Sequence, residues 1–145
     1  MQLKYHEARI LFTGDAESSY ETRLINRFGA PDFESDVLKV THHGSSSGTG
    51  THFVSTVAPG VAIASTGDDG GHRLEADTLE RLGGRPGPRR VYETIVDGDI
   101  IIRTDGQSYN DGILYEATFN DPGQFAPTLD EVTVDLNTAN AARNP

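Results

Sequence analysis

The chain has 145 residues, of which 35% are hydrophobic, with a formal net charge of −10 and a pI near 4.7. This length suits one domain, and the hydrophobic fraction allows a modest core. The acidity argues against unaided binding of a phosphate backbone, which needs Lys and Arg, unless a metal ion reverses the local charge. The absence of cysteine excludes disulfides, thiolate metal sites and cysteine nucleophiles.

No apolar run reaches the roughly 18 residues of a membrane span, and no apolar core follows a basic start at the N-terminus. We therefore expect a soluble chain without a signal peptide or transmembrane segment. The compartment stays undetermined. The acidity fits either simple solubility or a salt-adapted host.

Short apolar runs alternate with helical patterns through about residue 85. This alternation predicts an α/β layered domain with a mixed sheet, because the later strands follow tight turns and are expected to be antiparallel. The polar residues 120–145 are expected to form a linker or tail, with a short strand at 131–136. A strand or hairpin is expected at 2–12, further strands at 36–40, 61–65, 91–94, 99–103 and 113–119, and helices at 17–28, 51–57 and 73–82.

Two histidines end the second apolar run, in the stretch VLKVTHHGSSSG. Functional groups of α/β folds gather where strands end, and adjacent residues of an extended segment point to opposite faces. One histidine of the pair would therefore face a site while the other packs behind it or contacts substrate. Gly44 allows a close backbone turn, and the following serines supply hydroxyls. A simple capped turn explains the same stretch equally well.

Asp15 ends the first apolar run in the same way, after Thr13 and Gly14. A carboxylate and a histidine together suit zinc or manganese, and a carboxylate can bridge two metals. The alternative interpretation of Asp15 is an N-cap of the helix that follows. The two strand ends together are more informative than either alone.

His72 follows Gly71 and opens the expected helix 73–82, where a histidine could hold a phosphate or a scissile oxygen. It could equally be a surface residue. His6 and His52 are interpreted as partly exposed side chains without a function.

The succession of these segments resembles the metallo-β-lactamase-fold domain of competence proteins, the proteins of DNA uptake. The resemblance covers about residues 2–106 and rests on ILFTGDAE, SDVLKVTHHGSSSG, VAPGVAIASTGDDGGHRLEADTLERL and VYETIVDGDIIIRTDG. It implies a layered αβ/βα sandwich with a two-metal site at the sheet edges, holding Zn or Mn. Residues 1–119 would then be the C-terminal half of such a domain.

The resemblance also implies roles for individual residues. Asp15 matches the metal-bridging aspartate, and His42 matches a histidine ligand and is favoured over His43 for direct ligation. His43 and His72, with Asp15, would be catalytic, and Ser45, Ser46 and His72 would contact substrate. The implied reaction is metal-dependent hydrolysis of a phosphodiester or related ester, with DNA as one substrate.

The sequence departs from the family pattern most strongly in lacking the ligand motif His-x-His-x-Asp-His. Thr41 and Arg73 also replace prolines that the family often has beside its histidines. Because a catalytic zinc normally has three protein ligands, we expect weak or no hydrolysis by the chain alone. The alternative function is a non-catalytic binding or subunit module, or a remnant, that keeps the fold.

Two further expectations concern neighbours of this chain. The segment VTVDLNTANA resembles the start of a helix-hairpin-helix DNA-binding repeat, although a plain polar tail explains it too. If only half of a sandwich is present, Val37, Leu38, Val61 and Ile63 would lack cover on one side, and exposed apolar surface favours association. We therefore expect a homodimer or a complementary N-terminal half as partner.

Overall fold

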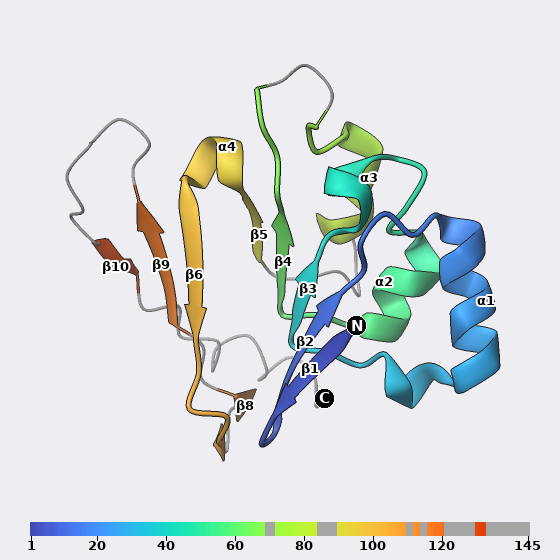
Figure 1. Ribbon diagram of the computed structural model, residues 1–145, viewed down its shortest axis with the longest axis horizontal. Coiled ribbons are helices and arrows are strands. Elements are labelled where there is room, and N and C mark those ends of the chain that lie inside the picture. The colour runs from blue at the N-terminus through green and yellow to red at the C-terminus, as the bar shows by residue number, and fades with distance from the viewer. Residues whose placement is uncertain (69–71, 84–89, 110–111, 114–115, 121–129, 133–145) are drawn as a thin grey trace.

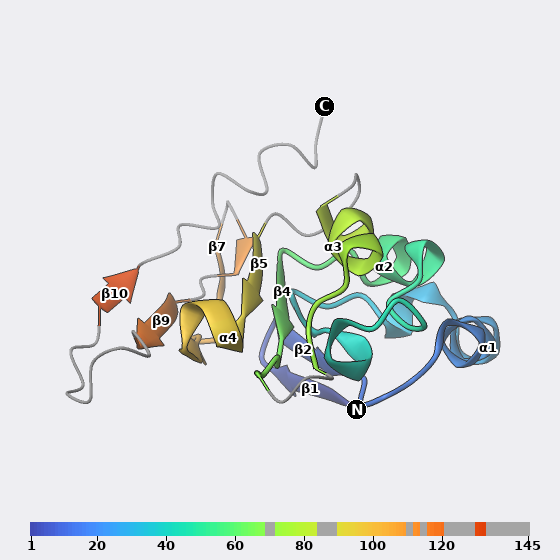
Figure 2. The same ribbon diagram turned by 90° about the horizontal axis from the view of Figure 1, so that it is seen from above.

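The computed structural model describes residues 1–68, 72–83, 90–109, 112–113, 116–120 and 130–132. Its elements form three layers: helices, a central five-stranded sheet, and a second smaller sheet (Figures 1 and 2). The fold is thus α/β with parallel and antiparallel strands, as the alternation predicted. Within the described residues, no helix combines the length and the apolar character needed to cross a bilayer.

The central sheet has the strand order β1-β2-β3-β4-β5. β1 pairs antiparallel with β2, and the other neighbours pair in parallel. The carboxyl ends of four parallel strands therefore lie along one edge. The strands are β1 (Gln2–Tyr5), β2 (Ala8–Phe12), β3 (Val37–Lys39), β4 (Val61–Ala64) and β5 (Arg90–Glu93).

Three helices cover one face of this sheet (Figure 1). They contribute Ile25, Phe53 and Leu82 to a core cluster that also contains Leu38 and Ala62 of the sheet. Each parallel connection passes through one of the helices, as such crossovers require. The helices are α1 (Ser18–Phe28), α2 (Thr51–Val57) and α3 (Ala76–Gly83), with 3₁₀ turns at Ala30–Asp32 and Thr41–Gly44.

The second sheet lies on the side of the central sheet opposite the helices, with β9 and β10 extending away from it (Figure 2). Ile100 and Ile102 of β6 pack against a buried cluster that includes Val37 and Val61. α4 (Thr94–Asp97) connects β5 to β6 (Asp99–Arg103). The remaining described strands are β7 (Ser108–Tyr109), β8 (Gly112–Ile113), β9 (Glu116–Asn120) and β10 (Asp130–Val132).

This cover corrects the expectation of a bare apolar face. Val37 and Val61 are 2% exposed, Leu38 is fully buried, and Ile63 is partly buried. Side chains alternate across the strands, so Leu38 meets the helices while Val37 and Val61 meet the second sheet. The expectation failed because β6 was assigned as a strand but not as a covering layer.

Most predicted elements are confirmed, with differences at element ends. The strand predicted at 91–94 was expected among the antiparallel ones, but β5 pairs in parallel with β4, and α4 was not predicted. The predicted helices 17–28 and 51–57 correspond to α1 and α2, and the predicted strand 99–103 is β6. The helix predicted from 73 begins at Ala76, and the expected strand 131–136 overlaps β10. The rest of the expected tail, including its Asn-Thr-Ala stretch, lies outside the described residues.

Candidate functional site

The loops after β2 and β3 are joined at the carboxyl edge of the sheet. The Thr13 hydroxyl donates to the Lys39 carbonyl at 2.8 Å, and the His42 N–H donates to the Gly14 carbonyl at 3.0 Å. These two bonds make Asp15 and His42 members of neighbouring loops, as the sequence predicted. Asp15 is exposed, and α1 begins after Glu17 without a side-chain cap, so Asp15 does not act as the N-cap.

His42 and His43 both adopt the left-handed backbone, with φ of 48° and 57°. For residues other than glycine this conformation costs about 1–2 kcal/mol each, so surrounding contacts must hold it. The extended backbone expected for this pair is therefore wrong. The chain turns at the histidines themselves, inside the 3₁₀ turn Thr41–Gly44.

The two imidazoles have different partners. His43 Nδ1 lies 2.7 Å from the Ser65 carbonyl oxygen at the end of β4. Because a carbonyl only accepts, Nδ1 carries the proton and Nε2 keeps its lone pair. This anchoring is typical of histidines that serve as metal ligands or bases. His42 Nδ1 makes only a long contact, 3.4 Å, with the Ser47 hydroxyl.

His72 joins this group from the loop after β4. Its ring meets the His43 ring edge-on, with centroids 4.4 Å apart. Its carbonyl accepts a hydrogen bond from the Gly67 N–H at 2.8 Å. The expectation that His72 opens a helix is wrong, because α3 begins four residues later, at Ala76. The argument that a helix N-terminus would bring phosphate to His72 therefore does not hold.

Lys39 is a cation at this edge of the sheet that the sequence analysis did not identify. It ends β3, is half-buried, and donates to the Val40 carbonyl at 3.2 Å. Burial lowers the pKa of the Lys39 amine, and the negative charge of Asp15 partly offsets this effect. An electrostatic interaction thus links the predicted aspartate to a partly desolvated amine.

Residues 41–50, here called the His-Ser loop, are bound from two helices. The Glu21 carboxylate of α1 accepts from the Thr41 hydroxyl at 3.0 Å and from the Thr49 and Gly50 N–H groups at 2.8 and 3.0 Å. Arg81 of α3 donates to three carbonyl oxygens of the loop, those of Ser46, Gly48 and Thr49. Neither Glu21 nor Arg81 was singled out in the sequence.

The part of the His-Ser loop that contains the serines is hydrogen-bonded to α3 and to the residue before it. The Thr78 hydroxyl donates to the Ser45 carbonyl at 3.1 Å, and the Glu75 N–H donates to the Gly44 carbonyl at 3.0 Å. Hydrogen bonds from the side chain and backbone of Ser46 lower the pKa of Glu75. Ser45 and Ser46 thus have partners within the chain, and their predicted contact with substrate remains a prediction.

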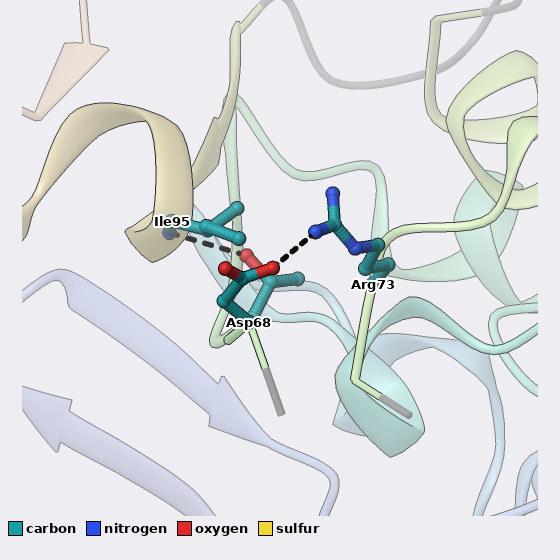
Figure 3. A network of polar contacts seen from close by, with 4 residues as sticks. Asp68, Arg73 and Ile95 are labelled. Atoms are coloured by element: carbon teal, nitrogen blue, oxygen red, sulfur yellow. Dashed lines mark hydrogen bonds and ion pairs between the residues drawn. The ribbon is translucent and has the colours of Figure 1, made fainter. Parts of the chain in front are cut away.

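The loop after β4 is held differently. Asp68 and Arg73 form an ion pair of 2.5 Å, with exposed fractions of 85% and 63% (Figure 3). The Ile95 N–H donates to the Thr66 hydroxyl at 3.3 Å. Burial, followed by the charge of Asp97, raises the pKa of Glu93 at the end of β5. Exposed ion pairs contribute about 0–1 kcal/mol, so the Asp68–Arg73 pair fixes its part of the loop only weakly. The start of the loop is bound more firmly, because the Thr94 hydroxyl accepts from the Thr66 N–H at 2.8 Å and donates to the Thr66 carbonyl at 2.7 Å.

The described residues bring two of the predicted metal donors into neighbouring loops but do not complete a metal centre. Among the parts of the chain described here, no three His, Asp or Glu side chains converge as a metal site requires. His42 and Asp15 have the donor chemistry that zinc and manganese prefer, and the described residues supply no third ligand beside them. His6 and His52 are both exposed. His6 lies in the β1–β2 turn at the opposite end of β2, whereas His52 lies in the first turn of α2, directly after the His-Ser loop.

Fold and edge together define a mixed α/β domain with a histidine-rich carboxyl edge. No protein-family profile matches the chain. The chain is similar to three competence-related proteins over about two fifths of its length. ComE operon protein 3 of Bacillus subtilis is 44% identical over 57 residues, which are 39% of this chain and 7% of that protein.

The other two similarities are of the same extent. Recombination protein 2 of Haemophilus influenzae is 43% identical over 58 residues, 40% of this chain and 7% of that protein. Competence protein ComA of Neisseria gonorrhoeae is 37% identical over 60 residues, 41% of this chain and 8% of that protein. The matched stretch is therefore less than a tenth of each relative's length.

Proposed function

We propose that this chain contributes part of a metal-dependent phosphodiesterase of the metallo-β-lactamase type, acting in DNA uptake. The observation that carries the proposal is the joining of the Gly14 and His42 backbones, which makes Asp15 and His42 neighbours at the carboxyl edge. The similarity to competence proteins supports the same assignment. The metal would be zinc or manganese, and two ions would occupy a completed site.

A bound divalent ion would supply positive charge and an activated water, which an acidic chain needs to meet a phosphodiester. Asp15 and His42 would be its ligands from this chain. His43, with its proton fixed on Nδ1 by the Ser65 carbonyl, has an Nε2 lone pair that can accept a proton from water. His72, in contact with the His43 ring, would bind substrate beside it.

The lack of a third ligand among the described residues bears on the activity of this chain. We propose that the missing donors come from residues outside the described ranges or from a second chain, either another copy or a complementary half. Metal affinity of the chain alone would then be weak, and its turnover slow.

Titration with Zn²⁺ and Mn²⁺ tests this proposal directly. We expect Asp15→Ala and His42→Ala each to weaken binding at least about 10-fold, because losing even an outer-shell partner of a metal ligand typically costs about 10–100-fold. His52→Ala is the matched control, since His52 is an exposed histidine in α2 and should leave affinity unchanged. Equal affinity in the wild type and all three variants would refute the assignment of the ligands.

The incomplete ligand set favours one alternative, a binding or subunit module without catalysis. Hydrolysis of a nitrophenyl phosphodiester at saturating metal separates the two. A metal-dependent turnover that Asp15→Asn abolishes supports the hydrolase. DNA binding that survives Asp15→Asn, with no turnover in the wild type, supports the binding module.

A further inference from the structure

Glu21 is a buried carboxylate for which the proposed chemistry has no use. It is 1% exposed and lies on the inward face of α1, one turn before Ile25. Burying a carboxylate is costly unless hydrogen bonds replace its water. Three bonds do so here, and all three donors belong to the His-Ser loop.

Two of those donors are backbone N–H groups at the start of α2. Gly50 is the N-cap of α2, and no side chain of the loop itself caps the helix. The first N–H groups of a helix lack partners within the helix and favour negative charge. Glu21 satisfies this need at the N-cap N–H of Gly50 and also accepts from the preceding Thr49 N–H, so it fixes the far end of the His-Ser loop from another helix.

The third donor is Thr41, the residue directly before the histidine pair. Its hydroxyl bonds Glu21 Oε1 at 3.0 Å, and Thr41 is fully buried. One carboxylate therefore bonds both ends of the loop, at Thr41 and at Thr49–Gly50. Arg81 of α3 donates to the carbonyls of Ser46 and Gly48, which lie between the two ends of the loop, and to the carbonyl of Thr49 at its far end.

The histidine pair needs this fixation because two consecutive left-handed residues store strain. Such a conformation persists only where its surroundings over-determine it. Buried, charge-assisted hydrogen bonds are the strongest of the loop's described contacts.

We propose that Glu21 is a positioning residue, whose carboxylate, together with Arg81, closes the His-Ser loop so that His42 and His43 keep their left-handed backbone at the carboxyl edge. The inference rests on the proposed function only for what the two histidines bind. The conformational part holds for any ligand of this edge.

Glu21→Gln is the sharpest test because it keeps the size of the side chain. Its amide oxygen can replace Oε1, but its NH₂ then faces the Gly50 N–H, and two donors oppose each other. We expect amide hydrogen exchange at Gly50, which loses its acceptor, to accelerate at least tenfold. The His43 imidazole resonances should shift in a ¹H–¹⁵N spectrum, and Zn²⁺ affinity should fall at least tenfold.

Two controls separate positioning from general loss of stability. Glu17→Gln removes the same charge from an exposed residue at the start of the same helix and should change none of the three measurements. Val61→Ala destabilises the core on the opposite face of the sheet. Even if Val61→Ala lowers Tm as much as Glu21→Gln does, it should leave the His43 resonances and the Zn²⁺ affinity unchanged.

The outcomes are distinct. If Glu21→Gln matches Val61→Ala in loop exchange and in imidazole resonances, Glu21 only stabilises the fold and the proposal is overturned. If the wild type binds no Zn²⁺, the proposed function fails, while the exchange and imidazole data still decide the positioning role. If Glu21→Gln does not fold, Arg81→Lys carries the same test, with the same expected changes in smaller measure.

Discussion

Two loops at the same edge of the sheet are held by different kinds of interaction. The His-Ser loop is bound by a buried carboxylate and by an arginine that donates to three of its carbonyls. The loop after β4, which contains His72, has an exposed ion pair between Asp68 and Arg73. Histidines of both loops meet, because the rings of His43 and His72 are in contact.

The difference indicates which part of the edge is preorganised. Buried charge-assisted bonds fix geometry, whereas exposed ion pairs contribute little and are screened by salt. His42 and His43 would thus meet a ligand without rearrangement. His72 would be placed by the ligand as much as by the protein.

The largest expected effect comes from Gly44→Ala in the His-Ser loop. Gly44 has φ of +97°, and a Cβ there would lie 2.6 Å and 2.8 Å from Leu74 Cδ1 and Cα. Backbone strain of about 1–3 kcal/mol adds to overpacking of about 1–3 kcal/mol. Urea denaturation should show a loss of unfolding free energy of that combined size.

Gly14→Ala is the matched control for this substitution. Gly14 has φ of +60°, but a Cβ there would have no atom within 4 Å. The Gly14→Ala variant should therefore lose only the free energy of backbone strain, about 1–2 kcal/mol of unfolding free energy. Equal losses in the two variants would show that the close approach of Gly44 to Leu74 contributes nothing, and that the loop is less tightly packed than described.

A smaller and opposite effect is expected from Lys39→Met beneath the same loop. Burial lowers the pKa of Lys39 below 10.5, so folding disfavours its charged form. The penalty is complete below the folded-state pKa and is relieved as pH rises toward 10.5, because the unfolded chain then binds more protons. Lys39→Met should therefore stabilise the protein at neutral pH, by less than about 1 kcal/mol after solvent screening.

Thermal unfolding across pH 7 to 10 checks this prediction. The gain of Lys39→Met over the wild type should shrink as pH rises, whereas Lys4→Met, an exposed lysine of β1, should show no such trend. A constant gain would mean that added apolar contact, and not relief of desolvation, explains the stabilisation.

The smallest effect is expected in the loop after β4. Arg73→Ala removes an exposed ion pair and should cost about 0.5 kcal/mol or less, with the difference vanishing in 1 M salt. Arg81→Ala, which removes charge-assisted bonds to the His-Ser loop, should cost about 1.5–3 kcal/mol. A similar cost for both arginines would abolish the contrast between the loops.

Much of the fold could be predicted because its signals are local. Apolar runs fixed β3 and β4, Gly29 marked the end of α1, and the placement of Asp15 and the histidine pair after strands followed from chain order. The start of α3 was misplaced because residues before Ala76 bond elsewhere, as the Glu75 N–H does to Gly44. Within α3, Leu82 is fully buried, whereas Leu79, three residues earlier, is exposed.

The fixation of the site could not be predicted because it depends on contacts between distant segments. Glu21 precedes Ile25 by four residues, which places both on the same, inward face of α1. This spacing was the one sequence signal that a carboxylate is buried there. Its partners at Thr49 and Gly50 are set by the packing of α1 beside α2. The left-handed backbone of His42 and His43 has only a weak signal in the sequence, because histidine is enriched in that conformation but adopts extended backbone as well.

The left-handed pair also restricts which sequences this edge can accept. Outside glycine, that backbone is populated mainly by asparagine, aspartate and histidine. β-branched residues at 42 or 43 would be strained before any ligand is considered. A combinatorial library at these two positions should therefore recover a short alphabet for folding, and within it only histidine and aspartate can also bind a metal through a side-chain imidazole or carboxylate.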